Sequence, residues 1–477
     1  MKKIYDLIDC SYDIDIYGIT DDSRNVKNGF VFVATNGFFV DHFDYIDEAI
    51  SNGCVFIVCD RKINIDFPHI VVDKNISDVY LEMCHKFYDI DFNELRFIGI
   101  TGTDGKTTTT TVVKQLIKNC AYIGTNGLEI QDKSFKTSNT TPVISELYCD
   151  LKKIIDSKCP NLAMEVSSEA LLHDRVKEFE FDIVGITNIT GDHLNIHKTF
   201  DNYVSCKKKL LRQVKKDGYV VINGDDPILN NIECRNMYKF GFKKENDYVI
   251  EDVIYQKNKT TIFLKYKDKK FKIVSPFVAE YNVYNVVMAF IICRLFGLSD
   301  EYLINSIKDL SPIKGRTEML DFGQDFDIVL DYAHTINGIK SVLNSFKNYK
   351  RIITVTGCAG GREVEKRHII GKYIMDNSDV SIFTMDDPRY ESVNDIIDQM
   401  VLDNDNYIRI IDREKAIRYA LDIADKDSVV LILGKGRDQY MAIEDKKIYY
   451  SDYDVICDYF DRRWLYHFFF FLDITLI

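Results

Sequence analysis

The 477-residue sequence has no long apolar run, no paired cysteines and no excess of positive charge. Lysine and arginine total 61 against 74 aspartate and glutamate residues, which gives a formal charge of -13. Proteins that bind nucleic acid generally need a basic surface that displaces counterions from phosphates. We therefore expect no nucleic-acid partner, although local basic sites for small anions are compatible with this composition.

The 12 cysteines are scattered and form no C-x-x-C pair, so neither a zinc knuckle nor a disulfide framework is indicated. Acidic residues near the N-terminus precede any long apolar run, and this end lacks the apolar core of a signal peptide. We expect reduced thiols and a cytoplasmic monomer without stable membrane association.

The last residues, 464–477, form an atypical apolar and aromatic tail. The tail is shorter than the roughly 20 residues that a spanning helix needs, and Asp473 interrupts it. Two interpretations stay open, a packed terminal segment or an artefact at the sequence end such as a frameshift. Membrane attachment ranks behind both.

The length and the apolar pattern predict the fold class. About 150 residues per domain is a common size, so the chain should form about three domains. Short apolar runs bounded by Gly, Asp or Asn indicate buried strands of mostly parallel sheets, with amphipathic helices such as 109–118 between them. The predicted class is α/β. The runs lie at 29–34, 54–59, 97–100, 182–186 and 429–433.

Two changes in composition predict domain boundaries. A polar stretch at 93–95 precedes a new strand, and a Pro/Gly hinge at 311–315 follows a helical segment. We predict a smaller α/β domain over 1–92, a central P-loop-type domain with a mostly parallel sheet over 93–313, and a Rossmann-like domain over 314–463.

The strand that begins at Arg96 leads into a loop of small residues and then into a helix-compatible stretch. Backbone N–H groups of such a loop can surround phosphate oxygens, and the helix N-terminus adds partial positive charge. Lys106 would neutralise the terminal phosphates and Thr107 would bind Mg²⁺. The strict Walker pattern is missed because Ile100 stands in place of its first glycine. The loop reads Thr101-Gly102-Thr103-Asp104-Gly105-Lys106-Thr107-Thr108.

The loop T-G-T-x-G-K-T-T resembles that of the Mur ligases and of the related folylpolyglutamate synthetases. Asp22-Ser23-Arg24, followed by Gly29, Gly37 and Asp41-His42, resembles the uridine-nucleotide domain of the UDP-N-acetylmuramoyl-tripeptide synthetases, the MurE type. Folylpolyglutamate synthetases lack that domain, so the MurE type is favoured. The resemblance implies that the three domains bind, in order, the UDP-muramoyl substrate, ATP and the amino acid.

The resemblance continues through the predicted central domain. Residues 138–142 resemble the family's N-T-T-P segment, residues 164–168 resemble M-E-V-S-S, and residues 187–194 resemble T-N-x-x-x-D-H-L. Where the family has His after the double Ser, this chain has Glu169. The UDP-muramoyl substrate is expected to contact Ser23, Asn139, Thr140, Thr141, Ser168 and Arg175.

The same resemblance implies a Mg²⁺ site, for which oxygen ligands are suited. Glu165, His193 and Lys207 join Thr107 as expected ligands. Lys207 lies four residues after Tyr203, at the position of a family lysine that CO₂ converts to N6-carboxylysine. The alternatives are a solvated strand end for Glu165, a helix start capped by the residue before His193, and a solvated basic helix face for Lys207.

The predicted C-terminal domain opens with residues 315–318 and 331–335, which resemble the family's G-R-x-E and D-Y-A-H-T. The resemblance implies that Arg316 reaches phosphate and that Asp331 and His334 reach the nucleotide once the domains close. The expected catalytic residues are Lys106, His193, Lys207 and Arg316. The expected ATP-binding residues are Gly102, Thr103, Asp104, Gly105, Lys106, Thr107, Thr108, Asn188, Arg316, Asp331 and His334.

In the family, a D-x-P-x segment selects the amino acid, and here it reads Asp386-Asp387-Pro388-Arg389. Arginine in the last place suits the extra carboxylate of meso-diaminopimelate, because a guanidinium forks onto a carboxylate. Diaminopimelate is therefore favoured over L-lysine. The expected amino-acid-binding residues are Arg362, Asp386, Asp387, Arg389, Gly434 and Asp438.

Several residues depart from the family pattern in this domain. Ile336 and Asn337 replace Pro-Asp, and Gly361 replaces an acidic residue. The acceptor segments also differ, with Asp387 for Asn, Arg437 for His and Asp438 for Glu. Their effect on activity stays open.

These patterns predict a ligase whose partners are small molecules: ATP, a UDP-muramoyl dipeptide and a diamino acid. ATP with Mg²⁺ would phosphorylate the D-Glu carboxylate of UDP-N-acetylmuramoyl-L-alanyl-D-glutamate, and an amine would displace phosphate. Two alternatives stay open. One is another ligase of the superfamily, such as a folylpolyglutamate synthetase, and the other is a weakly catalytic regulatory paralogue.

Overall fold

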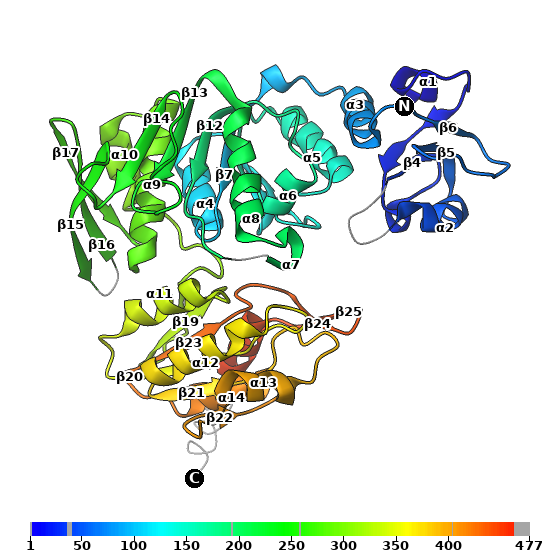
Figure 1. Cartoon of the computed structure of the whole chain (residues 1–477). Helices are drawn as coiled ribbons and strands as arrows, with labels where there is room; N and C mark the ends of the chain where they lie inside the picture. The colour runs from blue at the N-terminus through cyan, green and yellow to red at the C-terminus, as the bar shows by residue number, and fades with distance from the viewer. Residues whose placement is uncertain (1, 36–40, 192–193, 257–258, 403, 462–477) are drawn as a thin grey trace, which may run out of the picture.

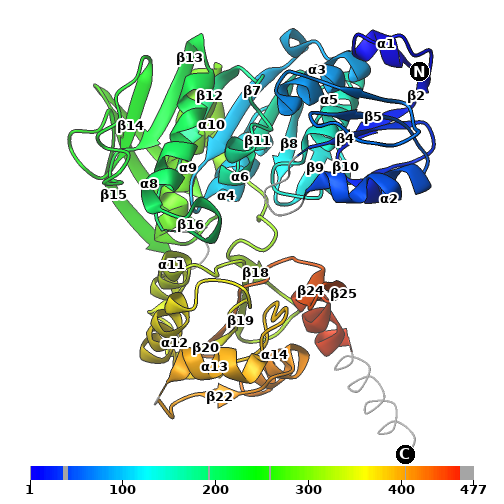
Figure 2. The same ribbon diagram turned by 45° about the vertical axis from the view of Figure 1, so that its right-hand side comes forward.

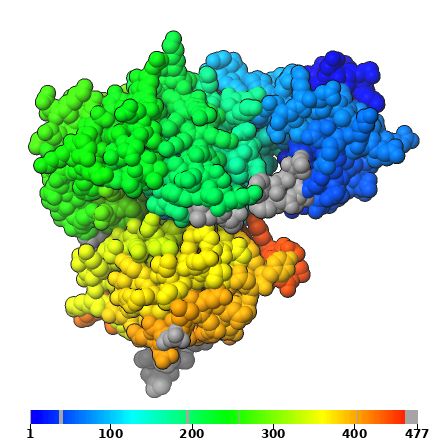
Figure 3. All heavy atoms as spheres, viewed as in Figure 1, coloured from blue at the N-terminus to red at the C-terminus, as the bar shows by residue number. Residues whose placement is uncertain are grey.

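The computed structural model describes residues 2–35, 41–191, 194–256, 259–402 and 404–461. Sheets of four, eleven and six strands follow one another along the chain and form three bodies (Figure 1). The first lies beside the second, and the third packs below the second (Figures 1 and 3). The predicted three-domain α/β fold is confirmed, whereas the boundaries 92/93 and 313/314 stay predictions. The tail 464–477 and His193 lie outside the described residues.

The N-terminal domain is a small parallel sheet of order β3-β4-β5-β6. Its last helix, α3, packs on the central domain through aromatic side chains. The ring of Phe92 contacts His85 of α3 and also Tyr148 and Phe179 of the central domain, with ring centroids within 6.2 Å. The elements are β1 Lys2–Lys3, α1 Ile4–Leu7, β2 Asp15–Ile16, β3 Gly18–Thr20, β4 Phe30–Ala34, α2 Ile46–Ser51, β5 Cys54–Cys59, β6 His69–Val71 and α3 Ile76–Tyr88.

The central sheet has the order β10-β9-β8-β11-β7-β12-β13-β14-β15-β16-β17, with antiparallel strands at both edges of a parallel centre. Its strands are β7 Arg96–Thr101, β8 Cys120–Gly124, β9 Gly127–Ile130, β10 Lys133–Phe135, β11 Asn161–Glu165, β12 Phe181–Ile186, β13 Val214–Asn223, β14 Met237–Gly241, β15 Tyr248–Gln256, β16 Lys259–Tyr266 and β17 Lys269–Ser275. Its helices are α4 Lys106–Leu116, α5 Ile144–Asp156, α6 Ser168–Leu172, α7 Leu194–His197, α8 Phe200–Lys208, α9 Glu280–Phe296 and α10 Asp300–Ile307.

Three neighbouring parallel strands, β11, β7 and β12, bring the predicted loops together. Because carboxyl ends of parallel strands meet at one edge of a sheet, the loops after Thr101, Glu165 and Ile186 gather there. Residues that are far apart in the sequence thus face one crevice.

The C-terminal sheet has the order β18-β19-β23-β20-β21-β22 and is parallel except for β18. A final helix covers 452–461. The β24–β25 hairpin lies on the side of this domain that faces the N-terminal domain (Figures 1 and 2). The elements are β18 Glu318–Leu320, β19 Asp327–Asp331, α11 Ile336–Phe346, β20 Arg351–Thr356, α12 Glu365–Asn377, β21 Val380–Phe383, α13 Val393–Val401, β22 Ile408–Arg409, α14 Arg413–Asp422, β23 Ser428–Leu433, β24 Tyr440–Ile443 and β25 Lys446–Tyr449.

A buried ion pair fixes the strand ends of this domain. The guanidinium of Arg413 donates to both carboxylate oxygens of Asp452, at 2.8 and 2.7 Å, and both side chains are at most 1% exposed. Arg413 also donates to the carbonyl oxygens of Met385 and Leu433. The loops that begin at residues 386 and 434, directly after Met385 and Leu433, are therefore held in place by Arg413.

Candidate active site

The phosphate loop is shaped by two glycines. Gly105 has φ +84° and caps α4, and a Cβ there would lie 2.3 Å from the Asn285 side-chain oxygen. A Cβ on Gly102 would lie 1.8 Å from the Thr187 hydroxyl oxygen. No larger residue fits either position without moving the neighbouring chain, which explains the glycines of the motif.

The loop is held by β12 and the residues after it. The Asp104 N–H donates to Asn188 Oδ1 at 2.9 Å, and the Asn188 amide donates back to the Asp104 carbonyl at 3.1 Å. The Thr103 N–H donates to the Asn188 carbonyl oxygen at 2.9 Å. Asn188, an expected ATP-binding residue, thus contacts the backbone of the loop and helps fix its shape.

Glu165 lies at the end of β11 with a fully buried carboxylate. It accepts hydrogen bonds from the Thr107 hydroxyl at 2.9 Å, the Thr125 N–H at 2.9 Å and the Tyr122 hydroxyl. Burial and the charge of Glu165 together raise the pKa of Tyr122. The solvated strand end considered for Glu165 is therefore wrong, because the carboxylate lies inside the site against the phosphate loop.

Lys207 is 1% exposed and its ammonium donates to the Gly102 carbonyl at 2.8 Å. Lys106 donates to the same carbonyl at 2.9 Å and to that of Thr103 at 2.7 Å. Two positive charges therefore meet at the phosphate loop, where a negatively charged ligand would be stabilised. The solvated helix face considered for Lys207 is wrong.

The C-terminal domain reaches the phosphate loop through two hydrogen bonds. Arg316 Nη2 donates to the Thr107 hydroxyl oxygen at 3.1 Å, and the Thr335 hydroxyl donates to Asp104 Oδ1 at 3.3 Å. Thr335 also caps α11 by accepting from Gly338. Arg316 therefore lies against the phosphate loop, and its expected contact with phosphate stays a prediction.

Asp331 ends β19 and His334 follows it, but the two have different surroundings. Burial raises the pKa of Asp331, whose carboxylate accepts from the N–H groups of Thr317 and Ala333. Asp331 thereby fixes the backbone beside Arg316. His334 is exposed, and its Nδ1 lies 2.8 Å from the Tyr332 carbonyl oxygen. Asn337, in the place of a family aspartate, is exposed on α11.

Most residues expected to contact the UDP substrate lie close to Glu165 and to the turn at Thr125. The Thr141 hydroxyl donates to the Glu165 carbonyl at 2.7 Å, and Arg175 donates to the Thr141 carbonyl at 2.9 Å. Thr140 lies 3.2 Å from Thr125 between their hydroxyl oxygens, and the Asn139 amide donates to Ser138. Ser168 is buried at the start of α6.

Acidic residues of two domains affect the charge of Arg175. Burial lowers the pKa of Arg175, and the negative charges of Glu169 and Asp21 oppose this effect. Glu169, where the family has His, therefore supplies a counter-charge on the central side. Ser23 is buried within the N-terminal domain, where its hydroxyl donates to Glu48.

A cluster of charged side chains, which we call the acidic pocket, lies at the carboxyl edge of the C-terminal sheet. Lys435, 1% exposed, lies 2.8 Å from Asp387, 3.9 Å from Asp386 and 3.8 Å from Asp438, measured between nitrogen and oxygen. A Cβ on Gly434 would lie 2.4 Å from an Asp386 oxygen, so glycine is needed for this approach. The pocket holds three carboxylates around one ammonium, a surplus of negative charge that would attract a cationic amine.

Arg389 lies at the rim of the acidic pocket in a left-handed conformation with φ +51°. Its Nη1 donates to the Gly360 carbonyl at 2.6 Å, and Gly361 leaves the guanidinium uncrowded, since a Cβ there would remain 3.6 Å away. Left-handed non-glycine residues often mark functional sites. Arg362 is exposed. Burial and the charges of Asp438 and Asp387 raise the pKa of the nearby Tyr440, and the charges of Arg389 and Arg362 partly oppose this effect.

Two asparagines of α9 were missed in the sequence. Asn282 and Asn285 are 3% and 4% exposed, and the Asn285 amide donates to Asn282 Oδ1 at 3.2 Å. Asn285 also accepts from Thr109 of α4, below the phosphate loop. Two polar residues three apart in the otherwise apolar helix 280–296 were the available signal.

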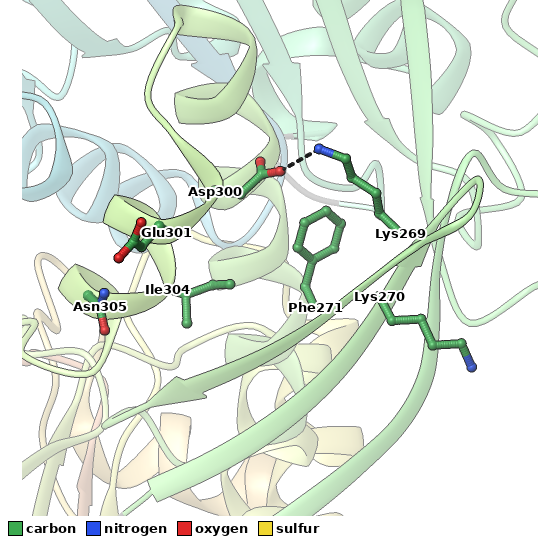
Figure 4. Close-up of a pocket in the computed structure, with 7 residues that line it drawn as sticks. All are labelled: Lys269, Lys270, Phe271, Asp300, Glu301, Ile304 and Asn305. Carbon is green, nitrogen blue, oxygen red and sulfur yellow. Dashed lines mark hydrogen bonds and ion pairs between the residues drawn. The ribbon is translucent and has the colours of Figure 1, made fainter.

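A cavity of about 380 Å³ lies between the two larger domains. Asn282 and Pro276 line it from the central domain, and Arg316 and Thr317 line it from the C-terminal side. The size and the mixed lining suit a small molecule. A second hollow, between β17 and α10, is lined by Lys269, Lys270, Phe271, Asp300, Glu301, Ile304 and Asn305 (Figure 4) and contains none of the expected site residues.

Among residues 2–35, 41–191, 194–256, 259–402 and 404–461, no three His, Cys, Asp or Glu side chains group as metal ligands. The oxygens beside the phosphate loop come instead from one carboxylate, Glu165, and the hydroxyls of Thr107 and Thr125. Such a hard oxygen set fits Mg²⁺, which commonly keeps several waters and binds one or two carboxylates together with substrate phosphates.

The fold and the site define a class: three-domain α/β proteins in which an arginine of the C-terminal domain contacts the phosphate loop of the central domain. Three family domains match in order, "Mur ligase family, catalytic domain" over 15–85, "Mur ligase middle domain" over 100–293 and "Mur ligase, glutamate ligase domain" over 315–436. The chain belongs to the Mur ligase family, whose members are ATP-dependent ligases.

The relatives include UDP-N-acetylmuramoyl-L-alanyl-D-glutamate–2,6-diaminopimelate ligases. That of Fusobacterium nucleatum is 35% identical over 94% of this chain and 95% of its own length. That of Clostridium tetani is 34% identical over 96% and 97%. A solved structure of a ligase with the same name has 25% identity and a TM-score of 0.63, and the alignment covers 96% of this chain and 97% of that one.

Another solved structure, the MurF ligase of Thermotoga maritima in complex with ADP, shares the fold. Its TM-score is 0.65 at 21% identity, over 87% of this chain and 93% of that one. Within the part of the chain that the structure describes, no helix is long and apolar enough to cross a membrane.

The acidic pocket predicts a pH-dependent effect on stability. Burial raises the pKa of Asp438 from 3.8 to about 6, with Lys435 opposing and Asp387 and Asp386 adding to the shift. When the pKa of an acid is higher in the folded than in the unfolded protein, the folded protein loses stability as the pH rises, here from about 4 to above 6. Asp438→Asn should therefore raise the free energy of unfolding at pH 7.5 by up to about 3 kcal/mol.

Thermal and urea unfolding between pH 4 and 8 measure this effect, with Asp376→Asn as the control because Asp376 is half-exposed in a surface pair with Lys372. The gain from Asp438→Asn should shrink towards zero near pH 4. An equal gain at every pH would contradict the assignment.

Proposed function

We propose that this ligase adds meso-diaminopimelate to UDP-N-acetylmuramoyl-L-alanyl-D-glutamate in the synthesis of peptidoglycan precursors. The observation that carries the proposal is the contact from Arg316 to Thr107, which in turn binds Glu165. This contact joins the phosphate loop to the C-terminal domain, which contains the acidic pocket. The names of the full-length relatives supply the substrates.

The reaction consists of two displacements. A carboxylate oxygen of the D-glutamate attacks the γ-phosphorus of ATP, and ADP leaves. The acceptor amine, having lost its proton, then attacks the acyl carbon, and inorganic phosphate leaves. Because a carboxylate is a poor electrophile and an acyl phosphate a good one, the enzyme mainly has to align the groups and screen their charge.

The positive groups around the loop are suited to that screening. Lys106 and Arg316 approach the phosphate loop from opposite domains, and each contacts it directly. The cavity beside Asn282 and Arg316 is a candidate site for the nucleoside of ATP. Asp331, by fixing the backbone at Thr317, would keep Arg316 aimed at the phosphates.

Glu165, Thr107, His193 and Lys207 would hold Mg²⁺, Lys207 after conversion to N6-carboxylysine. The ion would screen the phosphate charge and polarise the phosphoryl group. Carboxylation joins the Lys207 nitrogen to the carbon of CO₂, and two protons leave, one as the ammonium becomes an amine and one as the carbamate N–C bond forms. Burial beside the ammonium of Lys106 supports this, because a carbamate replaces one of two neighbouring positive charges by a negative one.

The substrates would lie across the three domains. The UDP-muramoyl part would contact Ser23 in the N-terminal domain and Asn139, Thr140, Thr141, Ser168 and Arg175 in the central domain. Asp386, Asp387, Gly434 and Asp438 would receive the ammonium end of the diamino acid. Arg389 and Arg362 would receive its carboxylates, for which a guanidinium fork is suited.

The alternatives have less support. A folylpolyglutamate synthetase does not account for the N-terminal domain, whose residues 15–85 match a Mur ligase domain. A weakly catalytic paralogue was suggested by departures such as Arg437 and Gly361. Arg437 binds Glu318 in a fork, and Gly361 keeps a hydrogen bond to Glu391, so both lie in ordered contacts.

The proposal predicts that ADP forms at a high rate only when UDP-N-acetylmuramoyl-L-alanyl-D-glutamate and an amino acid are both present. We expect diaminopimelate to be preferred over lysine and ornithine in a panel with mass detection of the product. Turnover with another acceptor class would change the substrate assignment, and silence with every acceptor would favour the regulatory paralogue.

Arg389→Ala tests the choice of acceptor. The variant should lose about 10- to 100-fold in kcat/KM for diaminopimelate, because charge-assisted hydrogen bonds to its extra carboxylate disappear. L-Lysine, which lacks that carboxylate, should be affected little. Arg409→Ala, which removes a partly buried arginine paired with Asp398 in the same domain, is the control. Equal losses for both acceptors would refute the role of Arg389.

A further inference from the structure

A second ion pair, between Arg437 and Glu318, connects the hinge to the acidic pocket. Arg437 Nε donates to Glu318 Oε2 at 2.8 Å and Nη2 donates to Oε1 at 2.5 Å, so the guanidinium binds both carboxylate oxygens. The ring of Tyr453 lies 3.3 Å from the Arg437 guanidinium carbon and covers one face. The Glu318 side chain is 9% exposed and that of Arg437 24%. The pair is therefore well oriented and largely shielded from solvent.

The Glu318 end of this pair holds the hinge. Glu318 Oε2 also accepts from the Gly315 N–H at 2.7 Å, and Gly315 directly precedes Arg316. The Gly315 carbonyl accepts from the Tyr332 N–H, and the Tyr332 ring lies 4.7 Å from the Arg316 guanidinium carbon. These contacts fix the backbone from which Arg316 reaches Thr107.

The Arg437 end holds the loop of the acidic pocket. Arg437 lies between Lys435 and Asp438, which line that pocket. The backbones also touch, since a Cβ on Gly315 would lie 2.8 Å from the Arg437 nitrogen. The Arg437 side chain thus connects the backbone next to Arg316, which contacts the phosphate loop, with the loop of Lys435 and Asp438 in the acidic pocket.

We propose that Arg437 is a positioning residue that couples acceptor binding in the acidic pocket to the placement of Arg316 at the phosphate loop. This inference rests on the proposed function, because it assigns the acidic pocket to the acceptor. An acceptor whose ammonium group is bound by Asp438 adds a contact that holds the 434–438 loop in one position. Arg437 of this loop binds Glu318, and Glu318 binds the backbone of Gly315. The bound acceptor therefore also fixes the position of Arg316 at the phosphate loop.

The chemistry of the fork explains why arginine suits this position. A guanidinium binds both oxygens of a carboxylate in one plane and so fixes direction as well as distance. Histidine, which the family resemblance places here, cannot make this fork. Arg437 therefore makes a contact to Glu318 that a histidine at this position could not make.

The test compares Arg437→Ala, Arg437→Lys and Glu318→Gln with Arg418→Ala. Arg418 pairs with Glu414 and Asp458 in the same domain and is 22% exposed, so it matches Arg437 in burial and charge but does not contact the hinge. Steady-state ADP formation is measured with saturating UDP-N-acetylmuramoyl-L-alanyl-D-glutamate and varied diaminopimelate. Calorimetry measures ADP affinity with and without diaminopimelate.

Arg437→Ala should lower kcat/KM for diaminopimelate about 10- to 100-fold, because displacing an aligned group by about 1 Å costs up to about 100-fold. The KM for the UDP substrate should change less than about twofold. In the wild type, diaminopimelate should change ADP affinity about fivefold or more, and this coupling should vanish in Arg437→Ala and Glu318→Gln. Arg437→Lys should recover part of it, and Arg418→Ala should retain all of it.

The double variant Glu318→Gln/Arg437→Ala should lose no more than the worse single variant, since both remove one interaction. Additive losses, or single variants indistinguishable from Arg418→Ala, would overturn the proposal. Glu318→Gln provides the test if Arg437→Ala does not fold. Failure of the proposed function is distinct, because the wild type itself would then form no ADP in response to diaminopimelate.

Discussion

The site depends on one buried carboxylate. Glu165 has no exposed surface, and it is stabilised by hydrogen bonds from Thr107, Tyr122 and Thr125. A buried charge without such partners would be strongly unfavourable, so strand β11, the phosphate loop and the turn after β8 must keep their relative positions. Arg316 joins this network through Thr107 and brings the C-terminal domain to the same point.

The acidic pocket of the C-terminal domain differs in character, because its charges are unbalanced. Around Lys435 lie three carboxylates, and burial raises the pKa of both Asp386 and Asp438. Such a pocket lowers the stability of the free protein and gains from a cationic ligand. The Arg413–Asp452 pair below it holds the strand ends that carry these acids. The structure therefore combines a fully paired support, Arg413–Asp452, with a cluster of unbalanced charge above it.

Much of this could be predicted from the sequence because the signals were local. The apolar run 54–59 coincides with β5, and the glycines around Lys106 have the backbone roles that the motif requires. What was not predictable came from distant residues. The burial of Lys207 depends on Gly102, and the partner of Arg437 is Glu318, more than a hundred positions away. The antiparallel β15–β17 edge also went unrecognised, because its exposed strands lack a continuous apolar run.

Binding of ADP with Mg²⁺ to Glu165→Gln tests the central claim most directly. Glutamine keeps the size of the side chain and can still accept hydrogen bonds from Thr107 and Thr125, but it removes the negative charge. Calorimetry with and without Mg²⁺ should show that the metal strengthens ADP binding in the wild type and has little effect in the variant. Equal strengthening in both proteins would contradict the assignment of Glu165 as the carboxylate on which the nucleotide site is built.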